Sequence, residues 1–191
     1  MIFYRKEAVS QIIEKANNTG KKLEIEIGSG NGHFLAEYGK QRPESIILGI
    51  EYKKQRCEKI QKKIQASYLD NCSLIYDDAQ KIVDSLPPES INAFHIYFPD
   101  PWPKSKHRKR RFLRAENLDK LAQSLKPGGQ IFFASDFFDY SLQAKILILL
   151  HPELNLVQTE APKEVYLSMF AARFTELEKQ INLVTAQKKG L

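Results

Sequence analysis

Apolar and polar positions follow two different periods along this chain. Short runs rich in Ile, Leu and Phe have the length and residue types of β-strands, and longer stretches with apolar residues at helical spacing separate them. The predicted strands span 23–27, 46–50, 73–76, 91–97, 130–134, 154–158 and 181–185. The predicted helices span 7–17, 33–40, 53–67, 79–86, 112–125, 140–150 and 168–179.

This order of elements predicts an α/β fold. Strands that alternate with helices through short loops favour a mostly parallel, seven-stranded sheet with helices on both faces. The length of 191 residues suits a single domain over residues 1–191, and no repeat or low-complexity segment interrupts it. Such sheets bind ligands at the carboxyl ends of their strands, near the reversal of strand order, so the functional residues are expected in the loops that follow the strands.

Composition adds few constraints of its own. The chain is 42% hydrophobic and 27% charged, as in an ordinary globular protein. No apolar run approaches the roughly 18–20 residues that span a bilayer, and Ile146 to Leu150 is expected to be the buried face of a helix. The first residues lack the pattern of a signal peptide. We therefore expect a cytoplasmic protein without membrane association.

The Cys and His residues predict no metal site. Cys57 and Cys72 lie far apart and form no CxxC motif, so both are expected to be reduced, structural thiols. The four His residues form no HxxH or HExxH pattern.

A glycine loop follows the first predicted strand. In EIGSGNG, the glycines at 28, 30 and 32 allow a tight turn and a close approach of the backbone to a ligand. A plain strand-to-helix turn is the alternative interpretation. Glu51, however, closes the next strand about 20 residues downstream, where a carboxylate can accept hydrogen bonds from both ribose hydroxyls. The glycine loop and Glu51 together indicate a nucleotide-type cofactor.

The acid beside this loop distinguishes two cofactors. Nicotinamide-binding loops read GxGxxG and place a pyrophosphate at a helix N-terminus, whereas this loop reads GxGxG and follows Glu26. A carboxylate repels a pyrophosphate but attracts a cationic amino acid or a sulfonium. Asp77 and Asp78, after the third strand, suit an adenine amino group. The loop favours S-adenosylmethionine, and its pattern resembles the Rossmann-like class I methyltransferase fold.

The segment FPDPWP follows the predicted strand 91–97. Its three prolines fix the backbone, and it carries Asp100 and the only tryptophan of the chain, Trp102. As alternatives to a functional role, Asp100 could be a turn residue and Trp102 a residue of the hydrophobic core. Since the loop after this strand faces the transferable methyl group in the class I methyltransferase fold, Asp100 is predicted to be functional.

A basic run without acids extends from Lys104 to Arg114. A net charge of +6 and a pI near 9.2 are by themselves weak evidence for a polyanionic partner. Charge gathered beside a rigid loop in the predicted cleft instead favours a surface that binds RNA phosphates, with a solvated loop as the alternative.

These motifs together resemble a known family. FPDPWPKSKHRKRR, with EIGSGNG, LGIE, DDA, LKPGG and the Ser135-Asp136 pair, is similar to the signature of the bacterial tRNA (guanine-N7-)-methyltransferases over nearly the whole chain. The resemblance implies a cytoplasmic, RNA-binding enzyme of tRNA modification. It would transfer the methyl group of S-adenosyl-L-methionine to N7 of a guanosine in the tRNA variable loop, leaving S-adenosyl-L-homocysteine, and would act as a monomer or homodimer.

The resemblance also implies residue roles. Asp100 is the implied catalytic residue. Contacts to the cofactor are expected from Glu26, Gly28, Gly30, Glu51, Asp78 and Asp100. Contacts to the substrate are expected from Lys104, Asp136 and Ser168, and contacts to RNA from Lys106, His107, Arg108, Lys109, Arg110 and Arg111. The family's T-x-x-E motif corresponds to Ser168 through Ala171, where Ala replaces the acid.

Three other functions remain open at this stage. A small-molecule or protein methyltransferase would share the glycine loop but would not need the basic run. An RNA-binding protein without catalytic activity would be consistent with Ala171, which replaces the acid of the family's T-x-x-E motif. A nicotinamide enzyme is disfavoured by the GxGxG spacing.

Overall fold

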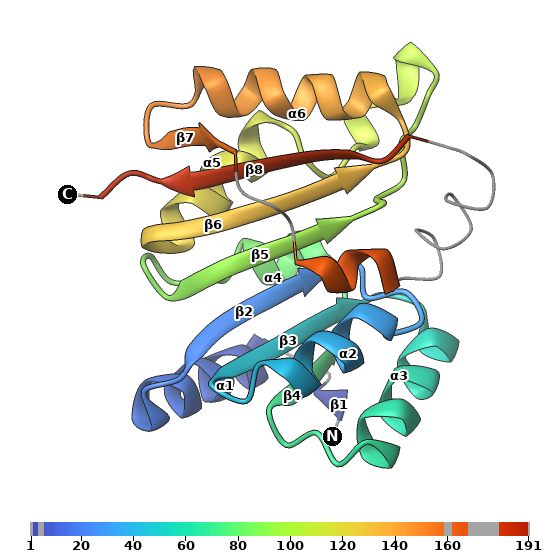
Figure 1. Ribbon diagram of the computed structural model, residues 1–191, viewed down its shortest axis with the longest axis vertical. Coiled ribbons are helices and arrows are strands. Elements are labelled where there is room, and N and C mark those ends of the chain that lie inside the picture. The colour runs from blue at the N-terminus through green and yellow to red at the C-terminus, as the bar shows by residue number, and fades with distance from the viewer. Residues whose placement is uncertain (1, 4–5, 159–161, 168–179, 191) are drawn as a thin grey trace.

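The computed structural model describes residues 2–3, 6–158, 162–167 and 180–190, which form one sheet with helices packed against it (Figure 1). The strands are β1 (Ile2–Phe3), β2 (Lys22–Ile27), β3 (Ser45–Glu51), β4 (Cys72–Tyr76), β5 (Ile91–Tyr97), β6 (Leu125–Ser135), β7 (Leu154–Val157) and β8 (Asn182–Lys188). The helices are α1 (Lys6–Thr19), α2 (His33–Gln41), α3 (Lys54–Ala66), α4 (Ala79–Val83), α5 (Ala115–Ser124) and α6 (Phe138–Leu150), with the 3₁₀ helices η1 (Ser105–Arg110) and η2 (Lys163–Leu167).

The order of the strands is β1-β4-β3-β2-β5-β6-β8-β7. Strands β1 to β6 pair in parallel, and β8 runs antiparallel to both β6 and β7. From β2 the chain builds outward through β3 and β4, then returns to β5 on the other side of β2. The strand order therefore reverses between β2 and β5, the position at which open α/β sheets bind ligands.

The predicted fold class is confirmed, and the seven predicted strands correspond to β2 through β8. The two-residue β1, which adds to the sheet edge beside β4, was not predicted. The predicted helix 168–179 lies outside the described residues.

Two hydrophobic clusters fill the space above and below the sheet. Strand residues alternate between them, so Leu23, Ile25 and Ile27 join the cluster under α1, α4, α5 and α6. The other cluster holds residues of α2, α3 and η2. All seven residues of β3 are buried, because helices cover this part of the sheet on both sides.

The apolar run at the end of α6 was interpreted wrongly. Ile148 is fully buried, but Ile146, Leu149 and Leu150 are 47%, 61% and 77% exposed. Consecutive residues of a helix point about 100° apart, so five in a row cannot share one buried face. Among the described residues, no helix is both long and apolar enough to cross a membrane.

The segment LKPGG also differs from expectation. It ends α5, as predicted, but it already belongs to β6, where Leu125 pairs with Ile91. The register then shifts before Gln130 pairs with Ala93, and Gly128 has a φ of 75°. This break in the pairing explains why a helix-stopping sequence can lie inside a strand.

Candidate active site

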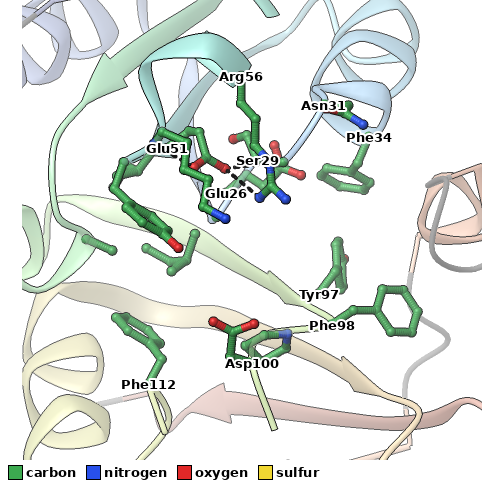
Figure 2. A pocket seen from close by; sticks show the side chains of 18 of the residues that line it. Glu26, Ser29, Asn31, Phe34, Glu51, Arg56, Tyr97, Phe98, Asp100 and Phe112 are labelled. Atoms are coloured by element: carbon green, nitrogen blue, oxygen red, sulfur yellow. Dashed lines mark hydrogen bonds and ion pairs between the residues drawn. The ribbon is translucent and has the colours of Figure 1, made fainter. Parts of the chain in front are cut away.

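A pocket of about 310 Å³ opens at the carboxyl ends of the central strands (Figure 2). Its walls come from the loops after β2, β3, β4 and β5, so it lies across the reversal of strand order. Small-molecule sites typically have volumes of about 300–1,000 Å³. The lining includes Glu26, Gly28, Gly30, Glu51, Asp78 and Asp100, the six residues from which cofactor contacts were expected.

The glycine loop turns sharply from β2 into α2. Gly28, Gly30 and Gly32 have φ angles of 78°, 57° and 70°, a region that residues with a Cβ rarely adopt. The amide groups of Gly28 and Ser29 both donate to the carbonyl of Ile50 at 2.9 Å, which ties the loop to β3. At Gly32 an added Cβ would lie 2.8 Å from Ile60 Cγ1, so glycine also allows α2 to approach α3.

Glu51 fixes the neighbouring wall. The residue is 2% exposed, and its Oε2 accepts a hydrogen bond from the amide of Gly30 at 2.9 Å. Its Oε1 accepts from the amide of Lys53 at 2.9 Å, and Arg56 Nη1 lies 3.7 Å from Oε2. The carboxylate is therefore held in one orientation, while each oxygen keeps a lone pair for a further donor.

Glu26 presents an unpaired carboxylate oxygen to the pocket. Its Oε2 is buried and accepts no hydrogen bond from any described residue. Burial raises the pKa of Glu26 to about 7; the nearby Glu51 acts in the same direction and the Ser29 hydroxyl in the opposite one. Buried polar atoms are rarely left unpaired, so a ligand donor is expected here.

Asp78 begins the short helix α4 at the third wall. Its Oδ1 accepts a hydrogen bond from the amide of Gln80 at 2.9 Å, which caps the helix. Asp77 in turn accepts from the amide of Asp78 at 2.7 Å. The cap fixes the Asp78 carboxylate at the edge of the pocket.

The FPDPWP loop forms the opposite wall and is strained. Phe98 and Trp102 have φ angles of 50° and 40°, although neither is glycine, a strain that costs of the order of 1–3 kcal/mol each. Hydrogen bonds hold the loop at both ends, from the Phe98 amide to the Ala134 carbonyl and from Arg111 to the Pro101 carbonyl, each at 2.8 Å. Asp100 lies between them with its exposed carboxylate facing across the pocket toward Glu51 (Figure 2).

The basic run folds into the helix η1 beside this loop, and no residue of η1 is buried. Arg110 stacks over the Trp102 ring at 4.9 Å, and His107 meets the same ring edge-on at 5.9 Å. Arg108 pairs with Asp139 of α6 at 2.9 Å. Trp102 therefore packs against the basic run rather than in the core.

The predicted contact of Arg111 with RNA is wrong, because its side chain is fully buried. Its Nε donates to the Pro101 carbonyl at 2.8 Å, Nη1 to Gln143 Oε1 at 2.6 Å, and Nη2 to Asp139 Oδ2 at 2.7 Å. The guanidinium also lies 4.8 Å from the Tyr140 ring centroid. Because each of its three nitrogens donates a hydrogen bond within the protein, Arg111 joins the Asp100 loop to α6 instead of facing solvent.

Two further residues predicted to contact the substrate, Lys104 and Asp136, do not line the pocket. Lys104 is exposed and precedes η1, and Asp136 is half-buried directly after β6. Ser168 and Ala171 lie outside the described residues. Among the described residues, no group of His, Cys, Asp and Glu could hold a metal ion.

Several lining residues were not predicted from the sequence, among them Tyr97, Arg56 and Phe112. Tyr97 ends β5, so the strand-end rule could have found it. Beneath it, His95 Nδ1 lies 2.9 Å from the Tyr97 hydroxyl, and His95 Nε2 lies 2.9 Å from Glu24 Oε2. Burial alone would raise the pKa of Glu24, but hydrogen bonds, chiefly from His95, lower it overall. This buried network fixes the tyrosine ring at the pocket wall.

Comparison with known proteins agrees with this geometry. The family model Methyltransf_4, described as "Putative methyltransferase", matches residues 20–189. The tRNA (guanine-N(7)-)-methyltransferase of Nitrosococcus oceani is 36% identical over 137 residues, which cover 71% of this chain and 58% of that protein. The protein of the same name from Chromobacterium violaceum is 36% identical over 182 residues, which cover 92% of this chain and 79% of that protein.

A solved structure shows the same fold. The crystal structure of the 16S rRNA methyltransferase KamB superposes with a TM-score of 0.65 at 18% identity and covers 98% of this chain and 95% of that one. The match over residues 20–189 and the 36% identity over 92% of this chain confirm the predicted kinship, although the chain spans only about half to four fifths of the relatives' own length. The chain belongs to the Methyltransf_4 family of methyltransferases and is related to the tRNA (guanine-N(7)-)-methyltransferases.

Proposed function

We propose that this protein transfers the methyl group of S-adenosyl-L-methionine to N7 of a guanosine in the variable loop of tRNA, in the cytoplasm. The proposal depends on one observation, which is that Asp100, the pocket and a basic helix lie next to one another. Asp100 lies on a strained, doubly anchored loop at the rim of a nucleotide-sized pocket, and an exposed basic helix continues directly from that loop. The names of the relatives supply the substrate and the position of methylation.

The pocket residues fit the proposed cofactor. An ammonium group can supply the donor that Glu26 Oε2 lacks. The fixed Glu51 carboxylate can accept from both ribose hydroxyls, and Asp78 from the adenine amino group. When bound, S-adenosylmethionine supplies an electrophilic methyl group on a positively charged sulfur.

Two carboxylates are proposed to hold the guanine. Asp100 and Asp136 follow the adjacent strands β5 and β6, so both lie at the same edge of the sheet. They can accept hydrogen bonds from guanine N1–H and the N2 amino group, and they stabilise the positive charge that the purine gains. Adenine has an acceptor at N1 and no N2 amino group, so it is rejected. Since N7 carries a free lone pair, positioning replaces a general base.

A direct assay tests the proposal. The protein is incubated with labelled S-adenosylmethionine and bulk tRNA that lacks the modification, and the RNA is then digested and its nucleosides are separated. We expect label in 7-methylguanosine. Tight tRNA binding without any transfer would favour the non-catalytic RNA-binding protein, and transfer only to small molecules or proteins would contradict the proposed substrate.

The pKa of Glu26 gives a pH prediction. Because a cationic ammonium group binds the ionised carboxylate, and the pKa of Glu26 is about 7, affinity for S-adenosylhomocysteine should rise about tenfold from pH 6 to pH 8. Glu26→Gln should bind more weakly and without this pH dependence. Isothermal titration calorimetry measures both. The matched control Glu14→Gln, at an exposed position on α1, should behave as the unmodified protein.

The raised pKa of Glu26 also affects the free energy of unfolding, which should fall with rising pH while the affinity for S-adenosylhomocysteine rises. The folded state keeps a proton on Glu26 between the ordinary pKa of 4.5 and about 7, whereas the unfolded chain has released it. This group therefore makes the free energy of unfolding fall as the pH rises through that window. In Glu26→Gln the contribution is absent.

A further inference from the structure

The positive charge of the chain is gathered in two segments. Residues 53–66 contain six Lys or Arg and one acid, and residues 104–114 contain seven Lys or Arg and no acid. Their net charges of +5 and +7 together exceed the +6 of the whole chain, so the remaining residues are net negative. The second segment contains η1, which the proposed function already uses. The first segment is α3 with the residue before it.

Helix α3 lies at the pocket. Cys57, Ile60 and Ile64 pack against the sheet, which leaves Lys54, Lys59 and Lys62 exposed along the outer side of the helix. At the N-terminal end of the helix, Lys53 and Arg56 line the pocket. Cations therefore continue from the mouth of the pocket along the surface of α3.

The two basic segments lie on opposite sides of the pocket. Figure 2 shows Arg56 on the wall across from Asp100, and η1 follows the Asp100 loop on that second side. Figure 1 shows α3 at the edge of the molecule toward which β2, β3 and β5 point. A nucleotide whose base reaches Asp100 at the mouth of this pocket, beside the bound cofactor, has a phosphate backbone that leaves in two directions, one toward each basic segment.

The exposed lysines of α3 repel one another, and no acidic side chain of the described residues forms an ion pair with them. Lys59 and Lys62 make no ion pair with a described residue, and like charges one helical turn apart destabilise a helix by about 0.2–0.5 kcal/mol per pair. Lys63 instead donates to the Asn31 carbonyl at 3.0 Å and so joins α3 to the glycine loop. Flexible lysines suit contacts to phosphate, which fix the position of a nucleic acid without reading its sequence.

We propose that Lys54, Lys59 and Lys62, here called the α3 cationic face, bind the tRNA backbone on the side of the pocket opposite η1. The inference rests on the proposed function, because the target guanosine must reach Asp100 at a pocket mouth that both surfaces flank. Phosphate contacts from both α3 and η1 would fix the orientation of the nucleotide, whereas contacts from η1 alone would let it rotate about that side.

The salt dependence of tRNA binding tests the α3 cationic face. In the Lys59→Ala/Lys62→Ala variant we expect affinity for bulk tRNA to fall about tenfold at low salt, and the slope of log K against log salt to fall by about 1.5, because two phosphate contacts are lost. The matched control, Lys22→Ala/Lys145→Ala, removes two exposed lysines from the far end of β2 and from α6 and should change neither quantity. The Lys106→Ala/Lys109→Ala variant reports on η1 in the same assay.

Each outcome has a defined meaning. If the α3 variant binds tRNA as the control does while the η1 variant weakens, the α3 cationic face is a solvated surface and the inference is overturned, although the proposed function stands. If the α3 variant weakens but the unmodified protein yields no 7-methylguanosine, the surface stands and the proposed function fails. Unchanged S-adenosylhomocysteine affinity and Tm in the variants would confirm that their folds are intact.

Discussion

Replacing Asp100 with alanine is expected to lower kcat for the proposed tRNA methylation by about 10²–10³-fold, the usual effect of removing one aligned group that stabilises charge in the transition state. Asp100 is exposed at the pocket rim, so its removal creates no cavity and Tm should stay near that of the unmodified protein. Single-turnover methylation with labelled S-adenosylmethionine measures the rate, and thermal unfolding measures Tm.

The control is Asp70→Ala, which removes an exposed carboxylate in the loop between α3 and β4. It should leave kcat and Tm unchanged. Asp100→Ala should still bind tRNA, because the cations of η1 remain. Full turnover in Asp100→Ala would contradict the role given to this residue and would leave Asp136 as the proposed acceptor.

The same substitution at two neighbouring arginines should give opposite results. Arg111→Met is expected to lower the free energy of unfolding by about 3 kcal/mol, because hydrogen bonds from a buried charged group are lost and the Pro101 carbonyl loses its donor. It should also lower kcat, since the Asp100 loop loses an anchor. The salt slope of tRNA binding should not change, because Arg111 has no contact with solvent.

Arg110→Met should show the reverse pattern. Arg110 is exposed over Trp102, so stability should change by less than about 0.5 kcal/mol while the salt slope falls by about 1. Thermal unfolding and tRNA titrations at several salt concentrations measure both variants. Equal losses of tRNA affinity without loss of stability would contradict the buried position of Arg111.

Much of the pocket could be predicted because its signals are local. A glycine loop after a strand and an acid at the end of the next strand are short-range patterns, and the strand-end rule brings them together without further knowledge of packing. The same rule placed Asp78 and Asp100 at the pocket. It could also have found Tyr97, but not Arg56, whose position depends on how α3 packs against the sheet.

The errors came from features that depend on distant parts of the chain. Five apolar residues in a row, Ile146 to Leu150, indicate helix or strand but do not say which of them face the sheet. The strand β1 has two residues and forms only because the edge of β4 is available to pair with it. The LKPGG segment stops a helix by local chemistry, but its place in β6 depends on pairing with β5.

The sequence by itself determined the α/β fold, the glycine loop with its acidic neighbours, and the concentration of charge after FPDPWP, because spacing and residue type suffice for each. Only the tertiary structure decided which cations of that run face solvent. Arg110 and Arg111 are adjacent and chemically identical, yet Asp139 and Gln143 of α6 accept hydrogen bonds from Arg111 and not from Arg110. Burial depends on an approach between segments about 30 residues apart, which no local pattern encodes.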